Sequence, residues 1–127
     1  MSEKMEKVNA LLDKAIVDYK SSKVLLENDD KDILCYAICF HCQQCVEKSL
    51  KAFLMYHEIN FPKIHDLLPL VKLCLNVDQR FKDFDLSEFS GFGVEIRYDE
   101  PSPTIEESET AFEIAGEVLD YIRDNLK

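Results

Sequence analysis

The segment from Asp32 to His57 limits the fold more than any other part of this chain. It contains no glycine or proline, and its apolar residues lie on more than one side of a helix drawn at about 100° per residue. A helix that is apolar over most of its circumference is stable only when other elements bury it. We therefore expect this segment to be the central helix of a helical bundle.

The rest of the chain has the apolar spacing of amphipathic helices, and no segment alternates as a strand does. Residues 4–27 form the first such helix, and proline marks the connections near residues 62 and 101. Capping residues predict three further starts: Asp66 for a short helix to about Asn76, Asp85 for a helix through Leu86, Phe89 and Ile96, and Thr104 for a helix to about Asn125. The prediction is one all-α domain over residues 1–127, an antiparallel (up-down) four-helix bundle with an additional short helix.

The charge distribution argues against a surface that binds nucleic acid. The net charge is −10, of which residues 1–65 carry −1 and residues 66–127 carry −9. Binding to a nucleic-acid backbone requires clustered positive charge. We therefore expect no general nucleic-acid binding, although a small basic pocket remains compatible with these numbers.

The sequence also predicts a cytoplasmic protein. The charged start of the chain lacks the apolar stretch of a signal peptide. Its longest apolar run, Ile33 to Phe40, is far shorter than the ~20 residues that cross a bilayer, so we expect no membrane association. Five cysteines, four of them within residues 35–45, suit free thiols in a reducing compartment better than a disulfide framework.

A polar stripe on the central helix is the first candidate site. His41, Gln44, Lys48 and Lys51 fall within an ~80° arc of a helix that is otherwise apolar. Buried polar groups need partners. The stripe is therefore either a solvated or interhelical hydrogen-bonded face, or a contact for a ligand or a second subunit.

The cysteines do not form a pattern typical of a metal site. Cys39, Cys42 and Cys45 drift around the helix instead of converging, and His41 points away from the first two. Structural zinc sites usually place C-x-x-C pairs on turns, with a second pair elsewhere. We expect buried apolar cysteines, no bound metal and no cofactor.

The remaining charged residues do not indicate a catalytic site. The paired carboxylates Glu106/Glu107 and Glu109/Glu113 are typical of a solvated helix face, and no motif of a hydrolase or a phosphate-binding loop is present. Arg97, followed by Tyr98, stands just before a proline-bounded loop. Its guanidinium either pairs with a neighbouring carboxylate or binds an anion such as phosphate.

Three stretches resemble the HEPN family. Phe40-His41-x-Gln43-Gln44-x-x-Glu47-Lys48-x-Leu50-Lys51-Ala52 is similar to the signature of the family's second helix, and this is the most specific match. His65-Asp66-Leu67-Leu68 resembles the start of its third helix, and Arg97-Tyr98 followed by proline resembles the segment before its last helix. The order and spacing agree over nearly the whole chain.

The resemblance implies a helical homodimer that is often encoded with a minimal nucleotidyltransferase, in toxin–antitoxin or related stress systems. A homodimer is also expected because the central helix has more apolar surface than one bundle face needs. Many family members are metal-independent RNases with an arginine followed by histidine after four to six residues. Here those positions hold Ser102, Pro103 and Thr104. The RNase motif of the family therefore lacks, in this chain, the residue that would transfer protons.

Two functions remain open at this stage. The first is a non-catalytic or weakly catalytic module that binds a nucleotide or a partner protein through His41, Gln44, Lys48, Lys51, Arg97 and Tyr98. The second is a variant RNase in which His41 or Tyr98 replaces the missing histidine. The acidic charge and the missing histidine favour the first.

Overall fold

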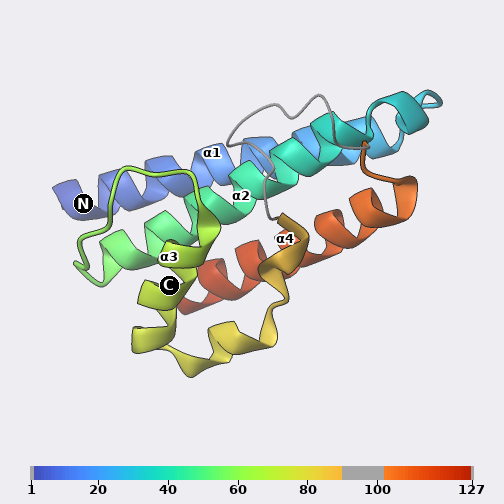
Figure 1. Ribbon diagram of the computed structural model, residues 1–127. Coiled ribbons are helices and arrows are strands. Elements are labelled where there is room, and N and C mark those ends of the chain that lie inside the picture. The colour runs from blue at the N-terminus through green and yellow to red at the C-terminus, as the bar shows by residue number, and fades with distance from the viewer. Residues whose placement is uncertain (1, 90–101, 127) are drawn as a thin grey trace.

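Four α-helices and three short 3₁₀ helices make up the parts of the chain that the structure, a computed structural model, describes, residues 2–89 and 102–126. The helices are α1 (Glu3–Leu26), η1 (Lys31–Ile33), α2 (Cys35–Tyr56), α3 (Leu67–Val77), η2 (Gln79–Asp83), η3 (Leu86–Phe89) and α4 (Ile105–Asn125). No strand occurs within these ranges, which confirms the all-α bundle. In Figure 1, α1 and α2 run antiparallel side by side, α4 packs along them, and α3 crosses one end of α2.

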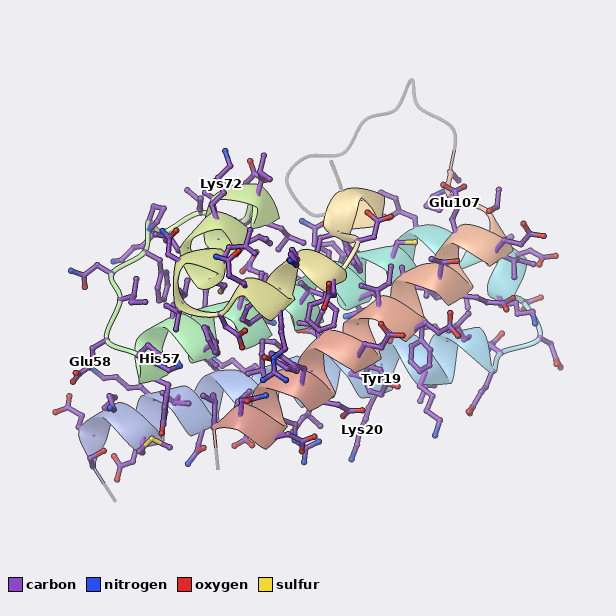
Figure 2. The ribbon with its side chains drawn as sticks, turned by 90° about the horizontal axis from the view of Figure 1, so that it is seen from below. Tyr19, Lys20, His57, Glu58, Lys72 and Glu107 are labelled. Carbon is purple, nitrogen blue, oxygen red and sulfur yellow. The ribbon has the colours of Figure 1, made fainter. Side chains whose placement is uncertain are left out.

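The helix boundaries follow local capping chemistry. Asp66 accepts a hydrogen bond from the Leu68 amide and caps α3, as the sequence predicts. Thr104 and Glu107, the latter labelled in Figure 2, form the reciprocal capping box that opens α4. Glu58, which follows the end of α2, has a φ of 58°, a left-handed conformation that ends the helix.

Two predicted boundaries differ from the structure. The central helix begins at Cys35, because the Asn28 side chain accepts a hydrogen bond from the Asp30 amide and the chain passes through η1 first. The helix expected from Asp85 is a 3₁₀ helix over Leu86–Phe89. Its expected continuation, including Ile96, lies outside the described residues.

The core is built around α2, which packs against α1, α3 and α4. Its fully buried residues include Ile38, Cys42, Val46 and Leu50. The apolar surface that suggested a dimer is therefore covered largely by this chain's own helices.

A close approach joins α1 to α4. The rings of Tyr19 and Phe112 stack with centroids 4.6 Å apart. A Cβ atom added to Gly116 would lie 2.9 Å from the Tyr19 hydroxyl oxygen, so only glycine fits here without displacing that ring.

The segment after α3 is fastened to α4 by polar and aromatic contacts. The Tyr121 hydroxyl donates a hydrogen bond to Asp78, and this bond is the main cause of the lowered pKa of that carboxyl. The Arg80 guanidinium lies over the Tyr121 ring, 4.8 Å from its centroid. These contacts hold η2 against the C-terminal part of the bundle.

Candidate functional site

A buried carboxylate on α1 organises half of the polar stripe. Asp18 is 7% exposed, and its two oxygens contact two side chains of α2. The His41 Nδ1 atom lies 2.9 Å from Oδ1, and the Lys48 ammonium lies 2.5 Å from Oδ2. Because a carboxylate only accepts hydrogen bonds, the imidazole donates from Nδ1 and its Nε2 atom is left for another partner. Asp18 thus joins α1 to two side chains of α2 that lie two helical turns apart.

A second buried carboxylate organises the other half. Glu47 is 3% exposed and accepts hydrogen bonds from Lys51, one turn along α2, and from His65 in the connection before α3. The Lys51 ammonium also lies over the Phe61 ring, 6.0 Å from its centroid. Glu47 therefore joins α2 to the connection that follows it.

A buried amide near the Glu47–His65 contact has an unused acceptor. Gln43 is 1% exposed, and its Nε2 atom donates to the His65 carbonyl oxygen at 3.4 Å. Its Oε1 atom is buried and has no hydrogen-bond partner in the described parts of the chain. Buried acceptors of this kind are uncommon in folded proteins.

The four stripe residues lie along one side of α2, as the sequence predicts. Gln44 is half-buried, and its side chain makes no hydrogen bond to any described residue. His41, Lys48 and Lys51 are also half-buried, and each is paired with Asp18 or Glu47. The other two predicted site residues, Arg97 and Tyr98, lie outside the residues that the structure describes.

The pairing changes what the stripe can bind. Two lysines and two carboxylates give this side of α2 no net charge when both histidines are neutral. A phosphate group would have to compete with Asp18 and Glu47 for the same ammonium protons. The stripe is therefore a set of fixed, alternating charges, which suits recognition of a complementary surface better than capture of a free anion.

A shallow groove adjoins the His41 end of the stripe. Its volume is about 460 Å³, and it runs between α1 and α2. The residues that line it are Val17, Lys20, Ser21, Val24, Leu25 and His41. The imidazole that Asp18 holds is thus also part of the wall of an accessible, largely apolar depression.

The cysteines are small buried residues, as expected. All five are buried and none is in a disulfide. Burial raises the pKa of the Cys42, Cys45 and Cys74 thiols to about 12, so these groups remain protonated and unreactive near neutral pH. No group of three or more histidine, cysteine or acidic side chains in the described ranges is arranged to hold a metal ion. The absence of a bound metal or cofactor remains a prediction.

Sequence reasoning did not select Asp18, Glu47 or His65 as site residues. The sequence did contain a signal for Asp18, because its spacing places it, with Ser22, on the same face of α1 as Ala15. The structure buries all three residues. Polar residues on an otherwise buried face indicate an interhelical bond. Glu47 and His65 stood within the quoted motifs, but their contact across the connection is visible only in three dimensions.

The fold and these paired charges define an all-helical domain with a polar side on its central helix. A model of the HEPN domain matches residues 8–125. The chain therefore belongs to the HEPN domain family. A crystal structure of an archaeal HEPN homologue is similar over 94% of this chain and 98% of that chain, with a TM-score of 0.65 and 18% identity, a likeness that concerns the fold alone. No curated protein sequence matches the chain.

None of the described helices combines the length and the apolar character that crossing a bilayer needs.

Proposed function

We propose that this chain is a cytoplasmic, single-domain HEPN binding module whose main ligand is a protein partner, a minimal nucleotidyltransferase. It would act in a toxin–antitoxin-like or stress system, as the family resemblance implies, and would have RNase activity near background. The observation that supports this proposal is the pairing of every stripe cation with a carboxylate of the same chain. A nucleotide is the second ligand of this module, with Arg97 as its anion contact.

The chemistry of RNA cleavage gives the proposal its second support. Attack by a 2′-hydroxyl needs a group that takes and returns protons, and such a group contributes typically about 10²–10⁴-fold. Ser102, Pro103 and Thr104 stand where the family's RNases have histidine, and none of the three titrates near neutral pH.

A metal-independent RNase with a variant active site is the alternative. One observation favours it: the Asp18 carboxylate holds His41 by Nδ1, the arrangement that orients an imidazole for proton transfer through Nε2. His41 also borders the groove between α1 and α2. In this case His41 would be the general acid or base and Asp18 would position it.

The partner proposal is tested by calorimetric titration. We expect the gene beside that of this chain to encode a minimal nucleotidyltransferase, and its purified product to bind this chain at equimolar ratio. Gln44→Glu should weaken binding by at least about tenfold, because a third carboxylate gives this side of α2 a net negative charge that a surface complementary to the wild type does not match. Gln44 makes no hydrogen bond to a described residue, so the fold should tolerate the change.

The matched control is Lys72→Glu on α3. Lys72 is exposed, and its side chain points away from the bundle in Figure 2. This variant changes charge more than Gln44→Glu does, yet should bind like wild type. A neighbouring gene of another class, or equal affinities for both variants, would contradict the proposed partner or its site.

A further inference from the structure

A second groove lies between the end of α1 and the first turns of α4, which meet at one end of the bundle in Figure 1. Its volume is about 500 Å³. The residues that line it are Leu26 of α1 and Glu106, Glu109, Thr110, Phe112 and Glu113 of α4. None of the stripe residues of α2 is among them, so this α1–α4 groove is separate from the site described above.

The base of the α1–α4 groove is apolar and already formed. Leu26 and Phe112 are half-buried, whereas the three glutamates are exposed, so the apolar side chains form the base and the carboxylates form the rim. The Phe112 ring is held by its stack on Tyr19, with the centroids 4.6 Å apart. An apolar side chain from outside would therefore meet a fixed surface, which reduces the entropy lost on binding.

The glutamates of the rim begin a row of carboxylates on the outer side of α4. Five exposed acidic residues recur at steps of three and four residues within an arc of ~80°: Glu106, Glu109, Glu113, Glu117 and Asp120. No lysine or arginine stands between the first and the last of them. None of the five forms an ion pair with a residue that the structure describes.

Helix stability does not account for this row. Like charges three or four residues apart destabilise a helix. Of the five, only Glu106 stands in the first turn of α4, where the helix dipole favours an acid. On α1, by contrast, lysines stand among the acids, as in the exposed Glu3–Lys7 pair. The unbalanced charge of α4 instead suits a surface that meets cations from outside the chain.

The arrangement suits an extended cationic partner better than a single metal ion. In the described ranges, no group of three or more histidine, cysteine or acidic side chains is placed to hold a metal. The row from Glu106 to Asp120 extends over roughly 21 Å of the helix. RNA would be repelled, because its backbone is itself anionic. A basic amphipathic helix supplies both the spaced cations and an apolar side chain for the base of the groove.

We propose that the α1–α4 groove docks a basic amphipathic helix of a partner protein. A leucine or phenylalanine of that helix contacts Leu26 and Phe112, and its lysines or arginines pair with the row of carboxylates on α4. The proposal does not rest on the proposed nucleotidyltransferase, whose test residue Gln44 lies on α2 and does not line this groove.

Fluorescence anisotropy with a synthetic peptide tests the chemistry of the surface. The probe is an alanine-based helix of about 18 residues that carries leucines and lysines on one side. The control peptide has the same composition, with its lysines on the side opposite the leucines. Wild type should bind the probe at least about tenfold more tightly, because only the probe presents both groups to the groove at once. Equal affinities, or no binding of the probe, would overturn the proposal.

Removal of two charges from the rim tests the location. Glu109→Gln combined with Glu113→Gln should weaken binding of the probe by at least about tenfold, because the lysines lose their partners. The matched control is Glu6→Gln combined with Asp13→Asn, which removes the same charge from exposed positions at least about 20 Å from Leu26 along α1. It should bind like wild type. Equal losses for the two variants would indicate a general attraction between net charges and would contradict the proposal.

A third variant, Thr110→Lys, separates binding from folding. A lysine at this exposed position lies within one turn of Glu106 and Glu113, so it should raise the melting temperature of the chain. The same ammonium competes with the lysines of the probe and should weaken binding by at least about tenfold. The neutral control Thr110→Gln should bind the probe within about threefold of wild type. Undiminished binding by Thr110→Lys would overturn the proposal.

Discussion

Leu50→Ala should lower the free energy of unfolding by about 2–5 kcal/mol, because it removes buried methyl groups and leaves a cavity. Leu50 lies on α2 with 0% exposure, in the cluster to which all four α-helices contribute. The cluster surrounds it from several sides, so little collapse can refill the space. Urea unfolding followed by circular dichroism measures the loss.

The same substitution at an exposed leucine is the control. Leu68 on α3 is 59% exposed, so Leu68→Ala should change the free energy of unfolding by no more than about 0.5 kcal/mol. Equal losses for the two variants would show that α2 is not the central helix of the bundle.

Asp18→Ala should lower the free energy of unfolding by about 1–3 kcal/mol. Breaking a wholly buried ion pair costs about 3–5 kcal/mol. The Lys48 and His41 side chains are 24% and 32% exposed and can recover part of their hydration, which places the expected loss lower. Most of this loss comes from leaving the Lys48 ammonium without a carboxylate.

A double variant and an exposed pair separate these causes. Asp18→Leu with Lys48→Met removes both charges and should be closer in stability to wild type than Asp18→Ala. Glu3→Ala removes the exposed ion pair with Lys7 on the same helix and should cost less than about 1 kcal/mol. A loss of similar size for Glu3→Ala and Asp18→Ala would show that Asp18 contributes no more than a surface charge.

The sequence was sufficient to predict the helices, because their signals are local. The unbroken apolar segment around Leu50, the Asp66 cap and the Thr104–Glu107 capping box each depend on residues within a few positions of one another. The prediction of an α-helix from Asp85 was wrong over Leu86–Phe89, where the structure has a 3₁₀ helix. The predicted capping pattern there did not determine which helix type forms.

For each polar contact of the stripe, the sequence predicted the stripe residue on α2 and not its partner. The helical spacing of His41, Lys48 and Lys51 places them together, but their partners Asp18 and His65 come from other elements. A periodicity argument shows which residues share a face and not which residue faces them. The homodimer was expected from the family resemblance and from the apolar surface of the central helix. The structure weakens the second reason, because α2 is largely covered by helices of its own chain.

The central claim is that the stripe on α2 binds a partner and does not cleave RNA, since its cations are paired and the family's histidine is missing. The most direct measurement is the cleavage rate of single-stranded RNA by purified wild type in the presence of a chelator. We expect a rate at background, unchanged in His41→Ala and in Asp18→Asn. Robust metal-independent cleavage by wild type that is lost in His41→Ala would contradict the claim and identify the chain as a variant RNase.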